Sequence, residues 1–266
     1  MSQIPLIDIG ALFTNDLSAK LNVAKQIDKA CRSHGFFAIK NHGIDNLDTL
    51  ENEAFRFFKN QTPQQKLELA PNKWNPKNPN TYRGYFPSSV NGKEGYDIGN
   101  PTFTSDHELV KKKYPMHDVL VWPEEKLLPG FKKYFETYYE KMINLARTLL
   151  EGFALATGKE ENFFKDKLQM KDSLATLRLN YYPFLDNIEA IEIAKDGTRI
   201  GIETHRDGSV LTILFQPIKG LQVENGDGWI DVEPSSEYFV VNTGLCMSRW
   251  TNGGRFFLHN NFLKLS

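Results

Sequence analysis

Several features that would mark a particular class of protein are scarce in this chain of 266 residues. Cysteine occurs only at Cys31 and Cys246, too few for a disulfide framework, and both lie in apolar-periodic segments, so we expect buried thiols without a chemical role. Lysine plus arginine (32) nearly equals aspartate plus glutamate (33), and no long run of one sign occurs. The sequence therefore lacks the electrostatic signature of a protein that binds nucleic acid or an anionic membrane.

Long apolar segments are missing as well. The opening MSQIPLIDIG has no basic start followed by an apolar stretch, and no run approaches the length of a membrane span. We therefore expect a cytoplasmic protein without membrane contact, a monomer whose partners are small molecules.

The first two thirds of the chain carry mostly helical patterns. IPLIDI and GFFAIKNHG indicate strands. Apolar spacing predicts helices at 17–31, 47–58 and 131–155, and Thr62 before Pro63 marks the start of another short helix. Residues 71–106, rich in Asn, Pro, Gly and Lys, are predicted to form a functional loop or lid.

From Ser173 onward the hydrophobic period changes to two. Short strands are predicted at LATLRLNYY, GIETHRD, VLTILFQ, LQVEN, WIDVEP, YFVVNTG and RFFLH. Short strands separated by Gly, Asp and Pro are typical of a sandwich or a jelly roll. The sequence therefore predicts a mainly β fold with flanking helices.

A histidine and an aspartate lie two residues apart in the apolar run IGIETHRDGSVLTILFQ. On a strand, His205 and Asp207 would share one face and Arg206 would point the other way. Taken alone, the pair also fits a core histidine with satisfied hydrogen bonds. With His259 from RWTNGGRFFLHNN as a third ligand, it would form the facial triad of an Fe(II) site, whose open face admits cosubstrate and oxygen.

Eight motifs, in order from Ile4 to about Gly254, resemble those of the 2-oxoglutarate/Fe(II)-dependent dioxygenases. They are IPLIDIG, GFFAIKNHG, YRGYF, KEGYDIG, LRLNYYP, THRDGSVLTILFQ, GLQVENGDGWIDVEP and FVVNTG with WTNGG. Within that superfamily the chain is most similar to the branch that contains isopenicillin N synthase. The resemblance implies a double-stranded β-helix (jelly-roll) core, with a mostly helical region at 1–170 and the jelly-roll domain at 171–266.

The resemblance also implies the chemistry. Fe(II) is held by His205, Asp207 and a distal histidine, and 2-oxoglutarate chelates the metal. Oxygen converts the cosubstrate to succinate and carbon dioxide, and a bound small organic molecule is hydroxylated, desaturated or cyclised. Ascorbate is the expected accessory reductant, and no catalytic residue beyond the metal ligands is expected.

Three further residues are candidates through the same resemblance. Asn180 and Tyr182 in LRLNYYP match positions near the cosubstrate, and alternate spacing would aim both into one cavity. A strand-end asparagine and a core tyrosine are the alternative. Arg83 matches a position that approaches substrate in the synthase branch, although a solvated loop arginine fits equally. His42, in NHG, is interpreted as a hydrogen-bonded buried histidine.

The C-terminal stretch departs from the family pattern. Alignment on Trp250–Gly253 puts Asn260 where the distal histidine is expected, so His259 can bind metal only if a bulge redirects it. In the family, the arginine of an Arg-x-Ser motif binds the far carboxylate of 2-oxoglutarate. Here only KLS at 264–266 is similar to this motif, and lysine cannot make the same bidentate contact. The closing strand and C-terminal helix are expected to be missing, as in a truncated or divergent family member.

Two alternatives to a 2-oxoglutarate-dependent oxygenase stay open at this point. One is an oxidase like isopenicillin N synthase, which takes all four electrons from its substrate and uses no 2-oxoglutarate. The other is a jelly-roll pseudoenzyme that binds a ligand or a protein, with its metal site impaired by the displaced His259.

Overall fold

The computed structural model describes residues 4–87, 93–165, 172–182, 202–224, 228–251 and 263–265, the last stretch and residues 202–203 by their backbone only. The chain separates into two compact units built from segments distant in sequence. Unit 1 comprises Met1–Leu47, Asn144–Lys167 and Glu192–Ser266, and unit 2 comprises Asp48–Ile143 and Leu168–Ile191. The division of the chain at residue 170 stays a prediction.

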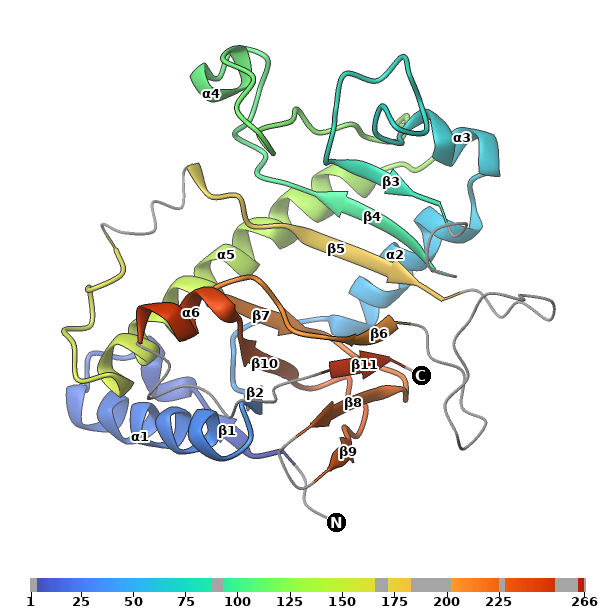
Figure 1. Ribbon diagram of the computed structural model, residues 1–266. Helices are drawn as coiled ribbons and strands as arrows, with labels where there is room; N and C mark the ends of the chain where they lie inside the picture. Colours follow the sequence, from blue (N-terminus) through green and yellow to red (C-terminus); the bar gives the residue numbers. More distant parts are fainter. Residues whose placement is uncertain are drawn as a thin grey trace. The chain divides into compact units, whose positions relative to one another are not determined.

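Unit 1 contains two four-stranded sheets (Figure 1). Their strand orders are β1-β2-β10-β7 and β6-β11-β8-β9. The first sheet consists of β1 (Leu6–Asp8), β2 (Phe36–Lys40), β7 (Leu211–Leu214) and β10 (Phe239–Thr243). The second consists of β6 (Ile202–His205), β8 (Leu221–Glu224), β9 (Trp229–Asp231) and β11 (Leu263–Leu265). All pairs except the parallel β1–β2 pair are antiparallel.

One apolar core joins the two sheets of unit 1. Phe36 and Val240 come from the first sheet, and Leu221 and Val223 come from the second. All four are at most 3% exposed. Two sheets that bury their inner faces against each other form a β-sandwich, the arrangement of a jelly roll. The predicted fold, mainly β with flanking helices, is confirmed.

Helices flank these sheets. Unit 1 holds the short helix η1 (Gly10–Phe13), α1 (Leu17–Ser33), the second half of α5 (Phe131–Ala156) and α6 (Leu245–Trp250). Asp16 caps α1 by accepting a hydrogen bond from the Ala19 amide at 3.0 Å. The predicted starts of α1 and α5 are confirmed, whereas α6 was not predicted from the sequence.

Unit 2 is a three-stranded antiparallel sheet packed against aromatic side chains. Its order is β3 (Gly84–Phe86), β4 (Glu94–Ile98) and β5 (Leu177–Tyr181). The unit also contains most of α2 (Leu47–Lys59), α3 (Pro63–Glu68), α4 (Glu108–Lys111) and the first half of α5. Phe57 of α2 stacks on Tyr96 of β4 with ring centroids 4.2 Å apart, and Phe58 stacks on Tyr181 of β5 at 5.2 Å. One face of the sheet is therefore packed against aromatic rings.

The prediction of a loop or lid at residues 71–106 was wrong, because this segment contains β3 and β4. Each strand is short and interrupted by glycine, so its local signal is weak. Pairing of β3 with β4 and of β4 with β5, which lies far along the chain, stabilises them, together with burial of Tyr85 and Tyr96. Gly84 is required here, since its φ of +122° is accessible mainly to glycine and an added Cβ would lie 2.1 Å from the Leu69 carbonyl oxygen.

The start of α3 offers a test of local stability. Thr62 Oγ1 accepts from the Gln65 amide at 3.2 Å, and the Gln65 side chain accepts from the Thr62 amide at 2.8 Å, which completes a capping box. We expect Thr62→Ala to lower the free energy of unfolding by about 1 kcal/mol, measured by chemical denaturation. Thr62→Ser, which keeps the hydroxyl, should leave it nearly unchanged; equal losses in both variants would contradict this role of the cap.

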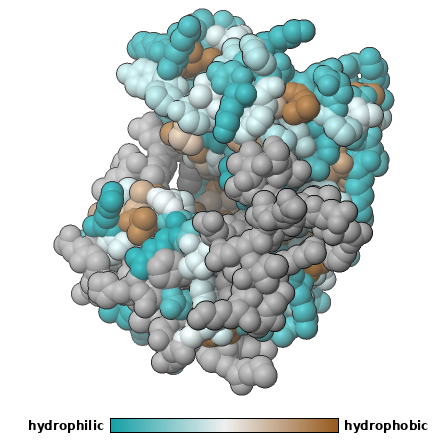
Figure 2. Space-filling view, turned by 45° about the vertical axis from the view of Figure 1, so that its right-hand side comes forward, coloured by the Kyte–Doolittle hydropathy of each residue, from teal (hydrophilic) through white to brown (hydrophobic). Residues whose placement is uncertain are grey.

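The described surface carries only scattered apolar side chains. On the face shown in Figure 2 it is mostly hydrophilic, with isolated hydrophobic residues. Large apolar side chains that are at least half exposed include Leu6, Phe13, Leu17 and Ile218. None of the helices within the described ranges has the length and apolar character needed to cross a bilayer.

Candidate functional site

His205 and Asp207 converge in unit 1, although not by simple strand alternation. Strand β6 ends at His205, so Asp207 lies beyond the strand, and the prediction that both residues lie on it was wrong in this respect. Their side chains nevertheless face each other, with His205 Nε2 3.6 Å from Asp207 Oδ1. The turn after β6 thus brings an imidazole nitrogen and a carboxylate oxygen to one spot.

Two neighbouring strands fix the orientation of the Asp207 carboxylate. Its Oδ2 accepts hydrogen bonds from Thr212 Oγ1 of β7 at 2.6 Å and from Asn242 Nδ2 of β10 at 2.9 Å. These bonds leave Oδ1 as the oxygen turned toward His205. The sequence analysis missed both residues, since their pairing across β7 and β10 is what places Thr212 opposite Asn242.

Helix α6 holds the turn that carries Asp207. The Leu245 amide donates to the Asp207 carbonyl at 2.8 Å, and the Gly244 amide donates to the Val210 carbonyl at 3.1 Å. The half-buried Cys246 adds two bonds, from its amide to Ser209 and from its thiol to Gly208. These contacts give the aspartate a rigid backbone. Cys31, by contrast, is fully buried as expected.

The donor set of this pair suits Fe(II). Neutral imidazole and carboxylate are the ligands of the facial triad, and an aspartate whose second oxygen is hydrogen-bonded is the usual arrangement of an oriented metal ligand. His259 lies outside the described residues, as does Asn260. Within the described ranges, no three His, Cys, Asp or Glu side chains form a group that could hold a metal.

In unit 2, polar side chains gather on the sheet face opposite the aromatic one. The register pairs Asn180 with Gly95 and Arg178 with Asp97, so alternate residues of β4 and β5 share this face. We call Lys93, Asp97, Arg178, Asn180 and Tyr182 the polar face. Asn180 lies on β5 and Tyr182 directly after it, and the expectation that both side chains enter one cavity stays a prediction.

The Tyr182 hydroxyl is a buried group without a partner among the described residues. Burial raises the pKa of this phenol, and the positive charge of Arg178 opposes that effect. The hydroxyl therefore stays protonated and can donate a hydrogen bond. A buried donor that the described residues leave unsatisfied is costly, which is the arrangement expected where a ligand supplies the acceptor.

The two cations of the polar face, Arg178 and Lys93, have different hydrogen-bond partners. Arg178 donates through Nε and Nη2 to both oxygens of the buried Asp97, each at 2.6 Å. Lys93 makes a hydrogen bond to a neutral group, the amide oxygen of Asn180, at 3.4 Å. Burial, reinforced by the nearby charge of Arg178, lowers the pKa of Lys93 to about 8.

Arg83 is buried within unit 2. Its guanidinium donates to Thr176 Oγ1 at 2.5 Å and to the Leu174 carbonyl at 3.2 Å, and only 2% of the residue is exposed. A solvated loop arginine, the alternative considered from the sequence, is therefore excluded. Burial lowers the pKa of Arg83, and the charges of Asp97 and Asp118 oppose that effect. Substrate contact by Arg83 stays a prediction.

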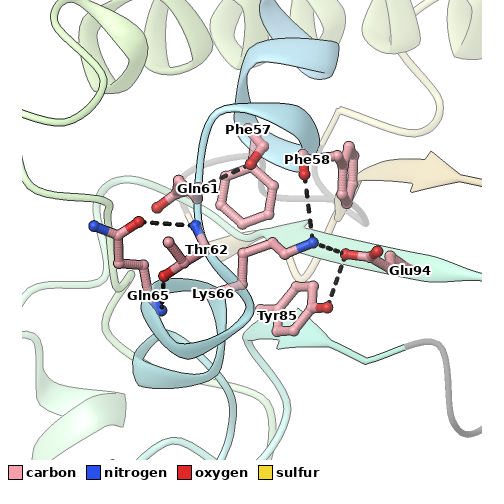
Figure 3. Close-up of polar contacts among 8 residues, drawn as sticks. All are labelled: Phe57, Phe58, Gln61, Thr62, Gln65, Lys66, Tyr85 and Glu94. Carbon is pink, nitrogen blue, oxygen red and sulfur yellow. Dashed lines mark hydrogen bonds and ion pairs between the residues drawn. The ribbon is translucent and has the colours of Figure 1, made fainter.

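A buried ion pair anchors the other face of β4 (Figure 3). Lys66 Nζ of α3 contacts Glu94 Oε2, and the Tyr85 hydroxyl donates to the same oxygen at 2.8 Å. Lys66 also donates to the Phe58 carbonyl at the end of α2, at 3.4 Å. Side-chain exposures of 7% for Lys66 and 12% for Glu94 show that both charges are largely removed from water.

His42 is a structural histidine, as predicted. Its Nδ1 accepts from the Ile44 amide at 3.1 Å, so Nε2 carries the proton and donates to the Glu237 carbonyl at 3.1 Å. Burial lowers the pKa of His42. Both ring nitrogens are thus used within unit 1.

Comparison with known proteins identifies the family. Residues 4–125 match the family model of the non-haem dioxygenase in morphine synthesis N-terminal region, and residues 174–261 match that of the 2OG-Fe(II) oxygenase superfamily. Isopenicillin N synthase from Lysobacter lactamgenus is 39% identical over 256 residues, which cover 95% of this chain and 78% of the synthase. The chain belongs to the 2OG-Fe(II) oxygenase superfamily. Within it, the chain lies in the branch like isopenicillin N synthase.

Other members of the superfamily agree with this assignment. Isopenicillin N synthase from Streptomyces griseus is 40% identical, with 94% of this chain and 77% of the synthase covered. The structure of a full-length Neurospora crassa protein in complex with alpha-KG has a TM-score of 0.76 and 28% identity, covering 98% of this chain and 77% of that one. The predicted class is confirmed: an Fe(II)-dependent oxygenase that oxidises a small organic molecule, with 2-oxoglutarate as the family's cosubstrate.

Proposed function

We propose that His205, Asp207 and His259 hold Fe(II) in this oxygenase and that Asn180 and Tyr182 contact 2-oxoglutarate. The observation that carries the proposal is the Asp207 carboxylate, which two hydrogen bonds fix with its remaining oxygen 3.6 Å from His205 Nε2. We further propose a monomer in which O2 is the oxidant, Arg83 lies near the substrate and ascorbate restores the reduced metal.

Each residue has a defined part in this proposal. When bound, Fe(II) would allow O2 to act as the oxidant, with 2-oxoglutarate and the substrate each supplying two of the four electrons that reduce it. Thr212 and Asn242 hold the Asp207 carboxylate in place, and α6 holds the backbone beneath it. The Tyr182 hydroxyl donates a hydrogen bond to a cosubstrate oxygen, which satisfies the buried donor. The Arg83 guanidinium donates a hydrogen bond to Thr176 Oγ1, which holds the segment around Thr176 in place.

A second candidate function is oxidation without 2-oxoglutarate, in the manner of isopenicillin N synthase. The identity of 39–40% to several of these synthases favours it. In that case the substrate supplies all four electrons for the reduction of O2, and ring closure is the expected outcome. Stoichiometric succinate formation distinguishes the two functions, because only the 2-oxoglutarate-dependent reaction produces it.

Anaerobic titration of the full chain with Fe(II) and 2-oxoglutarate tests the proposal. Chelation of Fe(II) by 2-oxoglutarate gives a weak visible charge-transfer band, and we expect this band in the wild type and its loss in His205→Ala. His34→Ala serves as the matched control and should keep the band. A folded chain that binds Fe(II) but shows no band points to the synthase-like oxidase, and a chain that binds no Fe(II) refutes both enzymatic functions and leaves the pseudoenzyme.

The hydrogen bond from Thr212 to Asp207 leads to a prediction about Fe(II) affinity. Removal of a partner that orients a metal ligand commonly lowers affinity or activity 10–100-fold, so we expect Thr212→Val to weaken Fe(II) binding by about 10-fold. Thr212→Ser keeps the hydroxyl and should bind Fe(II) as the wild type does. Anaerobic calorimetry measures both dissociation constants; unchanged binding in Thr212→Val would contradict the assignment of Asp207 as a ligand.

A further inference from the structure

A chain of two hydroxyl groups leads from the surface of unit 1 to the Asp207 carboxylate. Asp207 Oδ2 accepts a hydrogen bond from Thr212 Oγ1 at 2.6 Å, and Thr212 Oγ1 lies 3.1 Å from Ser209 Oγ. Ser209 belongs to the turn between β6 and β7 and is exposed, whereas Thr212 on β7 is half-buried. Ser209 thus contacts one of the two groups that orient Asp207.

The available protons fix the direction of this chain of hydrogen bonds. A hydroxyl has one proton to donate, and an ionised carboxylate can only accept. The Thr212 proton is therefore used in the bond to Asp207, so Thr212 accepts in its contact with Ser209 and Ser209 donates. Each hydroxyl directs its proton toward the next oxygen. Hydrogen bonds in such a chain polarise and strengthen one another, by about 10–30% per bond.

The two donors to Asp207 differ in how firmly their protons are held. Asn242 is 5% exposed, and its amide protons lie in the fixed plane of the amide group. The Thr212 hydroxyl proton, by contrast, rotates about the Cβ–Oγ1 bond and can turn toward another acceptor. A hydrogen bond from Ser209 occupies a lone pair of Thr212 Oγ1 and so favours the orientation in which Thr212 donates to Asp207.

Helix α6 fixes the backbone that carries Ser209. The Cys246 amide donates to the Ser209 carbonyl at 3.3 Å, and the Gly244 amide donates to the Val210 carbonyl at 3.1 Å. Gly244 approaches so closely that an added Cβ would lie 2.1 Å from the Ser209 carbonyl oxygen. The backbone of Ser209 is therefore held on both sides, which keeps its hydroxyl within reach of Thr212.

We propose that Ser209 is a positioning residue for the Asp207 carboxylate, that it acts through Thr212, and that it strengthens Fe(II) binding without contacting the metal. This inference rests on the proposed function, in which Asp207 is a ligand of Fe(II). Loss of the Ser209 hydroxyl releases the Thr212 proton to rotate, which weakens the support of Asp207 Oδ2. The other oxygen, Oδ1, is then less firmly held 3.6 Å from His205 Nε2.

Anaerobic calorimetry of Fe(II) binding to the full chain tests the proposal in a double-mutant cycle. We expect Ser209→Ala to weaken binding by about 3-fold, within the usual contribution of one neutral hydrogen bond. In a Thr212→Val background the same substitution should leave the dissociation constant unchanged, because valine has no oxygen that accepts from Ser209. Ser209→Thr keeps the hydroxyl and should bind Fe(II) as the wild type does.

Ser33→Ala is the matched control, since it removes an exposed serine hydroxyl that donates to the Lys29 carbonyl within α1 at 2.9 Å. It should bind Fe(II) as the wild type does. Undiminished affinity in Ser209→Ala overturns the proposal. An equal loss in the Thr212→Val background also overturns it, because Ser209 would then act through the turn itself.

The wild type in the same experiment reports on the proposed function. If it binds Fe(II) and loses this binding in His205→Ala, the metal site stands, and a negative result for Ser209 refutes the positioning role alone. A wild type that binds no Fe(II) overturns the metal site and the role of Ser209 together.

Discussion

Replacement of Lys66 by methionine is expected to lower the free energy of unfolding by about 3–5 kcal/mol, the range measured when one partner of a buried ion pair is removed. The cause is the Glu94 carboxylate, whose side chain is 12% exposed and which, among the described residues, would keep the Tyr85 hydroxyl as its partner. Methionine fills a similar volume, so the loss reflects the uncompensated charge rather than a cavity. Chemical denaturation of the two chains measures the difference.

A double variant that also removes the charge of Glu94 tests this explanation of the lost stability. In Lys66→Met/Glu94→Gln the buried charge is gone, and the amide can still accept from Tyr85, so most of the lost stability should return. Lys112→Met breaks an ion pair whose side chains are 57% and 74% exposed and should leave stability unchanged within error. A double variant as unstable as the sum of the single variants would show that Lys66 and Glu94 act independently.

Substitution of Gly244 by alanine is expected to cost about 3 kcal/mol, at the upper end of the usual range for overpacking. The added Cβ would lie 2.1 Å from the Ser209 carbonyl oxygen and 2.8 Å from the Ser209 amide nitrogen. These are backbone atoms, so no rotation of a side chain relieves the contact. Relief requires α6 and the 207–210 turn to separate, which stretches the bond from the Leu245 amide to the Asp207 carbonyl.

Because that turn carries Asp207, Gly244→Ala should also weaken Fe(II) binding. Gly208→Ala is the matched control for stability, since a Cβ at Gly208 meets no atom within 4 Å. We expect this neighbouring variant to unfold like the wild type. Anaerobic calorimetry measures Fe(II) binding, and chemical denaturation measures the free energy of unfolding. If Gly244→Ala is as stable as the wild type, the 207–210 turn can separate from α6 without cost and the prediction is wrong.

The elements with strong local signals were predictable. The apolar stripe of α5, the capping residues of α3 and the apolar run of β10 each depend on residues close together in sequence, and the structure contains all of them. By contrast, the segment with β3 and β4 was predicted to be a loop, because both strands are short and β5, which pairs with β4, lies far along the chain. Helix α6 has only six residues and a glycine cap, so its pattern is too short to recognise.

The candidate site was likewise predictable from the sequence only in part. The spacing of His205 and Asp207 was visible in the sequence, and their convergence was predicted. The hydrogen bonds from Thr212 and Asn242 depend on the register of two strands, which no local pattern reveals. Lys93 was overlooked because its neighbours on β5, Arg178 and Asn180, come close to it only in the folded sheet. His259 stays a prediction.

Strand β11 also has a consequence for the order of folding. In the sheet of unit 1, β6 pairs with β11 on one side, and β11 in turn joins it to β8. Leu263–Leu265 therefore lies directly opposite the strand that carries His205, and the expected lack of a closing strand and C-terminal helix stays a prediction. Contacts so distant in sequence form late, because a long loop must close first. A nascent chain can thus pair the strand that carries His205 with β11 only after β7, β8, β9 and β10, which lie between them in sequence, have been synthesised.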